Sequence, residues 1–165
     1  MRKSICAIVA LFMLIGLNGC LKKDTQSFTC TASLPKVSVP ASEIAAVEAY
    51  LSQKGITDAQ KNEYGYYYKI NAPGSGNAPD LCSRVTVFYK GTFTNGNIFD
   101  QTTSNPVSFP LNQVILGWQA GMQLIKPGGK IILYLPPSLG YGSQSAGSIP
   151  PNSVLIFEVQ LVSVG

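Results

Sequence analysis

The sequence predicts an α+β fold in which an antiparallel β-sheet carries one short α-helix across one of its faces. Two observations lead to this prediction. Beyond residue 63, most segments alternate apolar and polar residues with a period of two, which is typical of half-buried strands. Residues 114–125 are the exception, because their apolar residues recur at spacings of three and four, as in a helix. This order of strands, one helix and further strands, with turn signals between them, favours the α+β class.

Composition limits the chemistry that the chain can perform. Its 165 residues are 45% hydrophobic, enough for one compact domain with short appendages. The formal net charge is +4, but the basic residues are scattered, so we expect no nucleic-acid partner. The chain contains no histidine, which excludes Ser-His-Asp and Cys-His catalysis and histidine metal sites. We therefore expect no metal and no cofactor, and any catalysis has to proceed without imidazole.

The first segment has the pattern of an export signal. Two basic residues precede an uncharged apolar run over residues 5–17, which is too short to span a bilayer but suits a signal peptide. The run ends in LNGC, residues 17–20, which resembles the lipobox of bacterial lipoproteins. The resemblance implies a signal peptide over residues 1–19, a lipidated Cys20, and anchoring in the cell envelope of a bacterium, at the periplasmic face of the outer membrane. An ordinary secretory signal or a short anchor helix is the alternative.

Two cysteines remain after the signal and the lipidation site are set aside. Cys30 and Cys82 form an even pair in an exported chain, where thiols are commonly oxidised. We therefore predict a disulfide that ties the N-terminal segment to the domain. Two buried free thiols are the alternative.

The segments that precede the main domain differ from each other in character. Residues 20–40 are polar and show no sustained period, so they are interpreted as a tether after the lipidated cysteine. Residues 41–63 are expected to hold a short helix, with Ser42 as its N-cap and Gly55 at its end. One face of this helix carries Ile44, Val47 and Leu51. Such a short, single-faced helix is expected to pack on the domain rather than form a dimerising coil, so we expect a monomer.

The main domain is predicted to span residues 64–165. Its expected strands are, in order, residues 64–70, 84–93, 98–100, 107–109, 130–135 and 153–163. Asn95-Gly96 is a strong hairpin signal between the second and third of these. The inward faces are expected to carry Tyr64, Tyr66, Tyr68 and Ile70 in the first strand, Val85, Val87 and Tyr89 in the second, and Leu155, Phe157, Val159 and Leu161 in the last.

The expected helix over residues 114–125, VILGWQAGMQLI, holds the only tryptophan of the chain. Its apolar stripe consists of Ile115, Trp118, Met122 and Ile125. Gly117 and Gly121 flank Trp118, although glycine weakens a helix by up to about 1 kcal/mol relative to alanine. Gly128-Gly129 is expected to end the helix. Plain core packing is the simplest interpretation of such a stripe.

Six aromatic residues from separate segments can converge if this helix lies across the sheet. They are Tyr89, Phe99, Phe109, Trp118, Tyr141 and Phe157. A plain aromatic core is one interpretation, and a pocket is the other. Tyr141 favours the pocket because it lies in a loop rich in glycine and proline. Asp100 also favours it, because a carboxylate beside apolar surface is costly unless it is hydrogen-bonded.

Four motifs, in this order, carry a resemblance to a known family. They are VTVFYKGTFTNGNIFD (85–100), VILGWQAGM (114–122), LGYG (139–142) and SIPPNSVLIFEVQLV (148–162). Over about residues 64–165 the chain resembles the FKBP-type peptidyl-prolyl cis–trans isomerases. The resemblance implies a twisted antiparallel sheet wrapped around the short helix, with the substrate proline ring on Trp118. It also implies that the macrolide tacrolimus can bind in the same pocket.

Individual residues can be given roles in such a pocket. Our hypothesis is that the Ile115 N–H, unpaired at the start of a helix, and the Tyr141 hydroxyl each bind a substrate carbonyl. Asp100 is expected to hold Tyr89 in place, and these four residues form the expected catalytic set. The expected substrate-binding residues are Phe99, Phe109, Val114, Trp118, Ile149 and Phe157. The chain departs from the common family pattern at Val107, Gly140, Ser145 and Ser148.

The implied function is peptidyl-prolyl cis–trans isomerisation during the folding of exported proteins. An apolar pocket and oriented carbonyl groups would carry the reaction, which breaks no bond and moves no proton. Two alternatives remain at this point. One is a non-catalytic chaperone or binding module for proline-containing segments, and the other is a structural envelope lipoprotein that uses the fold as a spacer.

Overall fold

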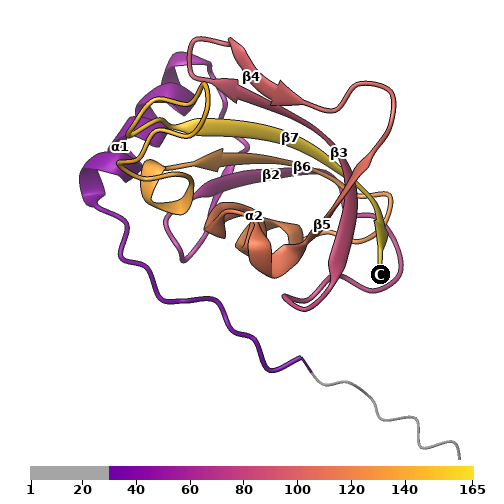
Figure 1. Ribbon diagram of the computed structural model, residues 1–165. Coiled ribbons are helices and arrows are strands. Elements are labelled where there is room, and N and C mark those ends of the chain that lie inside the picture. The colour runs from indigo at the N-terminus through magenta and orange to yellow at the C-terminus, as the bar shows by residue number, and fades with distance from the viewer. Residues whose placement is uncertain (1–29) are drawn as a thin grey trace, which may run out of the picture.

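The computed structural model describes residues 30–165 (Figure 1), so the predicted signal peptide and the predicted lipidation site, Cys20, lie outside the described residues. Within this range the chain forms seven strands, two α-helices and two short 3-10 helices. The strands are β1 (Gln60–Lys61), β2 (Tyr67–Ala72), β3 (Arg84–Phe93), β4 (Ile98–Gln101), β5 (Val107–Pro110), β6 (Lys130–Leu135) and β7 (Leu155–Val164). The helices are α1 (Ala41–Gln53), η1 (Leu111–Gln113), α2 (Leu116–Met122) and η2 (Pro137–Leu139).

All strands pair antiparallel in one sheet, with the order β1-β2-β6-β7-β3-β4. The two long strands, β3 and β7, pair along nearly their whole length. The short strands β4 and β5 share the other edge of β3, with β5 beside its first half and β4 beside its second half. The predicted α+β fold is therefore confirmed.

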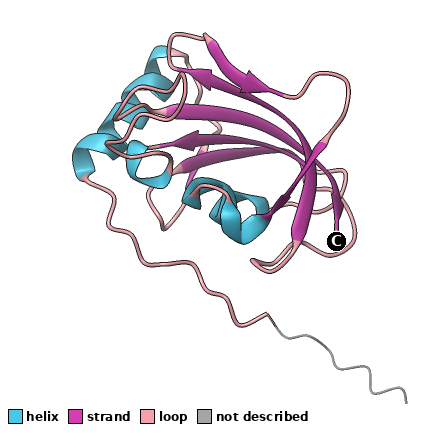
Figure 2. Ribbon diagram, in the orientation of Figure 1, coloured by secondary structure: helices cyan, strands magenta, loops and turns pink. Residues whose placement is uncertain are grey.

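Helix α2 lies across the inner face of the curved sheet (Figure 2). Two glycines allow it to come very close. A Cβ atom at Gly117 would stand 2.5 Å from both terminal methyl groups of Leu135, and one at Gly121 would stand 2.5 Å from a methyl group of Leu133. The glycines that weaken the helix therefore let its backbone rest directly on β6.

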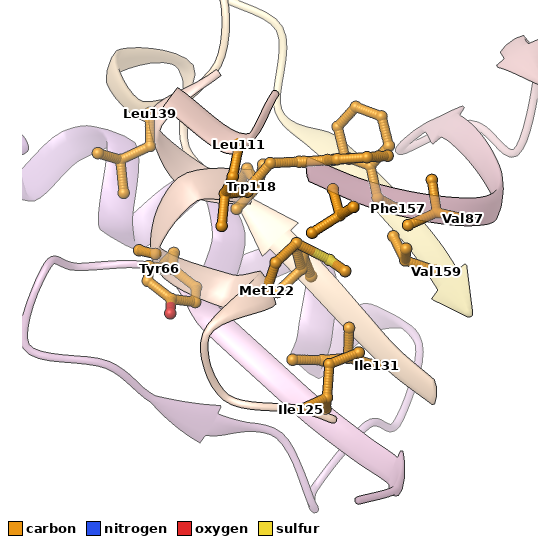
Figure 3. Close-up of a cluster of buried hydrophobic side chains, with 14 of the residues drawn as sticks. Tyr66, Val87, Leu111, Trp118, Met122, Ile125, Ile131, Leu139, Phe157 and Val159 are labelled. Atoms are coloured by element: carbon orange, nitrogen blue, oxygen red, sulfur yellow. The ribbon is translucent and has the colours of Figure 1, made fainter. Parts of the chain in front are cut away.

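The main core fills the space between α2 and the sheet (Figure 3). Trp118, Met122 and Ile125 point into it from the helix side, and Ile131, Phe157 and Val159 point into it from the strands. The predicted inward face of the last strand is confirmed, because Leu155, Phe157, Val159 and Leu161 are all buried. The helical stripe is likewise apolar and inward, apart from Ile115, which is only half-buried.

Helix α1 covers part of the opposite face of the sheet. Its buried residues Val47 and Leu51 pack with Tyr134 and Ile156, whose side chains leave β6 and β7 on the side away from α2. The expected cap of this helix is wrong by two residues. Helix α1 begins at Ala41, and Pro40 is its N-cap without a side-chain hydrogen bond. Proline has a fixed backbone angle that suits a helix start, so no hydroxyl cap is required.

Further details of the expected elements differ in the structure. The first strand begins at Tyr67, and Ile70 is 40% exposed rather than inward, because β1 flanks β2 only as far as Tyr68. Helix α2 ends at Met122, so the glycine pair after it belongs to a separate turn in which Gly128 has φ 81°. The two 3-10 helices were not predicted, since three residues are too few to show a period.

The segment before α1 lies against the domain. Residues 30–40 form no regular secondary structure, yet their apolar side chains pack on the main core, namely Cys30, Leu34, Val37 and Val39. Cys30 and Cys82 are joined by a disulfide with Cα atoms 5.8 Å apart. The tether interpretation is therefore wrong for this stretch, because spaced apolar residues and a covalent link hold it in place. Neither α-helix in residues 30–165 is long and apolar enough to cross a bilayer.

Candidate active site

A pocket of about 550 Å³ opens between α2, the edge of β3 and the loop that follows η2. It contains all ten residues that the sequence assigned to catalysis or substrate binding: Tyr89, Phe99, Asp100, Phe109, Val114, Ile115, Trp118, Tyr141, Ile149 and Phe157. It also contains four residues that were not assigned, Gln113, Ala146, Gly147 and Ser148. Residues that lie up to almost seventy positions apart in the chain thus line one cavity. Of the two interpretations of the six aromatic residues, the structure agrees with the pocket.

Trp118 forms the floor of this pocket and is only 4% exposed. Three rings stand nearly perpendicular to its indole. Those of Tyr89 and Phe157 have centroids 5.3 Å away, and that of Phe109 is 6.1 Å away. Edge-to-face pairs of this kind contribute about 0.5–1.5 kcal/mol each beyond burial. The indole is therefore held rigidly, with aromatic walls rising around it.

Phe99 reaches the pocket because a glycine on β3 leaves space for it. A Cβ atom at Gly91 would stand 2.5 Å from the Phe99 ring and 3.1 Å from the Phe157 ring. The two rings pack edge to face with centroids 5.4 Å apart. Sequence analysis missed Gly91, although a glycine inside an otherwise alternating strand is a known signal of close approach.

Tyr89 and Asp100 connect two neighbouring strands at the pocket wall. The Tyr89 hydroxyl donates a short hydrogen bond to Asp100 Oδ2. The Tyr89 backbone is anchored as well, because its N–H donates to Thr102 Oγ1 at 3.0 Å and its carbonyl accepts from the Thr102 N–H at 3.0 Å. Burial, together with the bond to Asp100, raises the pKa of the Tyr89 phenol far above its usual value. Tyr89 therefore stays protonated at neutral pH and serves as a fixed donor to the carboxylate.

Two hydrogen-bond donors at the rim have no partner among residues 30–165. Ile115 is the N-cap residue of α2, and its backbone N–H makes no hydrogen bond within residues 30–165. Gln119 steadies this turn by donating from Nε2 to the Val114 carbonyl at 2.7 Å. Across the pocket, Tyr141 is 40% exposed, and partial burial raises the pKa of its phenol, with Asp100 as the second cause. The Tyr141 hydroxyl is thus protonated and available to donate.

The residues that sequence analysis missed come from short turns. Gln113 belongs to η1, which links β5 to the start of α2. Ala146, Gly147 and Ser148 form a tight turn, in which the Ala146 and Ile149 backbones exchange hydrogen bonds at 3.0 and 2.9 Å. The glycine in this turn has φ 57°, and its position before Ser-Ile-Pro-Pro was the available signal.

The positions that depart from the family pattern differ in whether they line the pocket. Ser148 lines the pocket, whereas Val107 and Ser145 do not. Val107 is 36% exposed on β5. Of these, Ser148 is the one that places a polar group at the pocket.

A curved antiparallel sheet around a short helix, with a tryptophan-floored aromatic pocket beside that helix, defines the class of FKBP-like α+β proteins. The sequence model described as "FKBP-type peptidyl-prolyl cis-trans isomerase" matches residues 76–162. The chain belongs to this family, and the resemblance seen in the sequence is confirmed.

Individual relatives agree with this assignment. A probable FKBP-type peptidyl-prolyl cis–trans isomerase of Haemophilus influenzae is 46% identical over 110 residues, which cover 65% of this chain and 46% of the relative. The crystal structure of FkpA from Escherichia coli superposes with a TM-score of 0.68 at 39% identity, over 75% of this chain and 60% of that one. A peptidyl-prolyl cis–trans isomerase structure from Pseudomonas syringae gives 0.66 at 32% identity, over 78% and 98%. The chain spans about half the length of the curated relatives it matches.

Proposed function

We propose that this protein catalyses cis–trans isomerisation of peptide bonds that precede proline. The observation that carries the proposal is the Trp118 floor with three rings perpendicular to it, which forms a flat apolar seat with rigid walls. A proline ring is compact and apolar, and its nitrogen carries no backbone N–H, so it fits such a seat. Membership of the FKBP-type isomerase family supports the same conclusion.

The reaction suits a site without an acid–base residue. Rotation about an amide bond faces a barrier of about 18–20 kcal/mol, which is mainly lost resonance. The uncatalysed X-Pro bond takes tens to hundreds of seconds to rotate, so millisecond turnover requires roughly 6–7 kcal/mol of transition-state stabilisation. The planar amide is more dipolar than the twisted one. A water-poor aromatic pocket therefore favours the twisted form over the ground state.

Orientation of the substrate backbone supplies the remaining stabilisation. The unpaired N–H of Ile115 and the hydroxyl of Tyr141 lie on residues that both line the pocket, and we assign to them the substrate carbonyls on either side of the rotating bond. Asp100 keeps the Tyr89 ring in position through their hydrogen bond and transfers no proton. The apolar walls contact the proline and its neighbours through Phe99, Phe109, Val114, Ile149 and Phe157.

A peptide assay tests this function directly. Interconversion of a short X-Pro peptide is followed by a conformation-sensitive signal, with and without the protein. We expect acceleration by wild type and its loss in Trp118→Ala, while the control Ile98→Ala, altered at a residue that is 52% exposed and outside the pocket, stays active. Absence of acceleration in the wild type, with peptide still bound, would leave the non-catalytic binding module instead. Absence of tacrolimus binding as well would point to the spacer.

The cellular setting is part of the proposal. An exported protein with a lipid on Cys20 would act on proline-containing segments of unfolded proteins in the cell envelope, at the periplasmic face of the outer membrane, as a monomer. The disulfide between Cys30 and Cys82 supports an oxidising compartment. Incorporation of labelled palmitate into wild type and its loss in Cys20→Ser is the expected result. Equal labelling of both proteins would contradict the lipoprotein assignment.

A further inference from the structure

Helix α1 is connected to the turn before the pocket rim by one carboxylate. Glu43, in the first turn of α1, accepts two hydrogen bonds from Ser138 of η2. The Ser138 N–H donates to Oε2 at 2.8 Å, and the Ser138 hydroxyl donates to Oε1 at 2.8 Å. Both residues are half-buried, although 95 positions separate them in the chain. We call this pair of hydrogen bonds the Glu43–Ser138 clasp.

The peptide group held by the clasp also holds the backbone around Tyr141. The N–H of Ser138 and the C=O of Pro137 belong to the same planar peptide unit. That carbonyl accepts the N–H groups of Gly140 and Gly142, each at 2.9 Å, and these two glycines flank Tyr141. A carboxylate bound to one end of a peptide group polarises it and strengthens the bonds at the other end. Glu43 therefore fixes the plane of the group on which both neighbours of Tyr141 depend.

Few other contacts determine where Tyr141 sits. Beyond it, residues 143–145 are exposed. Two further backbone bonds reach this turn: the Gln144 N–H donates to the Tyr141 carbonyl at 3.3 Å, and the Asn152 N–H donates to the Gly142 carbonyl at 2.8 Å. The Tyr141 hydroxyl makes no hydrogen bond within the described chain, and the residue is 40% exposed. The position of this hydroxyl is thus set mainly by the turn that begins at Pro137.

We propose that Glu43 is a positioning residue for the isomerase reaction, acting through Ser138 and the Pro137 carbonyl on Tyr141. Helix α1 precedes the part of the chain that matches the family, residues 76–162, so the clasp joins a segment outside that match to the pocket rim. The catalytic part of this inference rests on the proposed function. Its structural part, the control of the backbone around Tyr141, does not.

The test compares two glutamates of the same helix. Glu43→Ala removes the clasp, whereas the control Glu48→Ala removes hydrogen bonds to Lys61 and Tyr67, which are not part of the pocket. We expect Glu43→Ala to lower kcat/KM toward an X-Pro peptide about fivefold, mainly through kcat, with no change for Glu48→Ala. In a Tyr141→Phe background the same substitution should cause less than about a twofold further loss, because its effect passes through that hydroxyl.

Amide hydrogen exchange gives a second readout that does not need turnover. We expect exchange at Gly140 and Gly142 to become about tenfold faster in Glu43→Ala and to stay unchanged in Glu48→Ala. Ser138→Ala keeps one of the two bonds and leaves α1 intact, so it should shift both readouts in the same direction by less, even if Glu43→Ala does not fold. Unchanged exchange at the two glycines would overturn the inference, and so would an equal loss of kcat/KM in both backgrounds. Faster exchange in Glu43→Ala, together with a wild type that does not accelerate isomerisation, would refute the proposed function alone.

Discussion

Tyr89 and Asp100 form a hydrogen-bonded pair that joins β3 to β4 at the wall of the pocket. The pair lies beside the Trp118 indole, against which the Tyr89 ring packs edge to face. The Asp100 carboxylate accepts a hydrogen bond from the Tyr89 phenol, which stays protonated. In the structure, Asp100 thus fixes the position of the Tyr89 ring. An acidic residue in a pocket can transfer a proton or fix a neighbouring side chain, and the hydrogen bond to Tyr89 favours the second function for Asp100.

Substitution at both ends of this pair distinguishes these functions. Tyr89→Phe removes the bond, and we expect a loss of about 0.5–1.5 kcal/mol in unfolding free energy and a severalfold fall in kcat/KM. Asp100→Asn keeps an acceptor for the Tyr89 hydroxyl and should retain most of the activity. The measurements are denaturant unfolding and the X-Pro peptide assay. Near-complete inactivation by Asp100→Asn would show that the carboxylate transfers a proton.

The pH dependence of stability follows from the tyrosines. Burial raises the pKa of Tyr134 to about 12, and burial also raises the pKa of Tyr66 and of Tyr89. A group with a raised pKa in the folded state keeps its proton when the unfolded chain has lost it. The contribution of these tyrosines to the unfolding free energy is therefore constant below about pH 10 and falls above it, by about 1.4 kcal/mol per pH unit for each such tyrosine.

Denaturant unfolding between pH 8 and pH 12 measures how steeply the unfolding free energy falls with pH. Tyr134→Phe removes one of the three tyrosines, so we expect it to reduce this slope by the contribution of one ionising group.

Turnover is expected to depend on pH differently from stability. Because the chain has no histidine, we expect kcat/KM to vary little between about pH 6 and pH 8. A steep change in that range would indicate an ionising group that the pocket residues do not include.

The disulfide provides a third prediction. Cys30 and Cys82 are 52 positions apart, and closing a loop of that size stabilises a folded chain by about 4 kcal/mol in the entropic description. Replacing both cysteines by alanine should therefore lower the unfolding free energy by up to that amount, and reductant should have no effect on the variant. It should also loosen Leu34 and Val37, which pack on the core next to the link. Free sulfhydryls at Cys30 and Cys82 in the unfolded, unreduced wild type would refute the disulfide.

Much of the fold could be predicted from local patterns, because a strand buried on one face alternates with a period of two. Leu155, Phe157, Val159 and Leu161 illustrate this, and all are buried as expected. The pocket residues could be assigned because four motifs occur in the family order, although composition alone allowed a plain aromatic core. Both interpretations of Trp118 hold in part, because its indole is buried in the core and also forms the pocket floor.

Other features could not be predicted because they depend on contacts between distant residues. The clasp between Glu43 and Ser138 has no period and no motif, and neither residue is unusual in its own segment. Ile70 continues an inward alternation, but its exposure depends on where a neighbouring strand ends. Gly91 is a partial case, because a glycine inside an alternating strand is a signal of close approach, but only the structure shows that it makes room for the ring of Phe99 on the next strand.

The contact between Gly117 and Leu135 yields the last prediction. Alanine is normally the better helix former by up to about 1 kcal/mol, so an exposed Gly→Ala change in a helix stabilises. At Gly117 the added methyl group would stand 2.5 Å from the Leu135 side chain, and such overpacking costs about 1–3 kcal/mol. We expect Gly117→Ala to lower the unfolding free energy and, by lifting Trp118 from the sheet, to weaken peptide binding. Leu135→Ala makes room for the methyl group, so Gly117→Ala should be nearly neutral in that background. A stabilising Gly117→Ala in the otherwise wild-type chain would mean that α2 is not held against β6 by this contact.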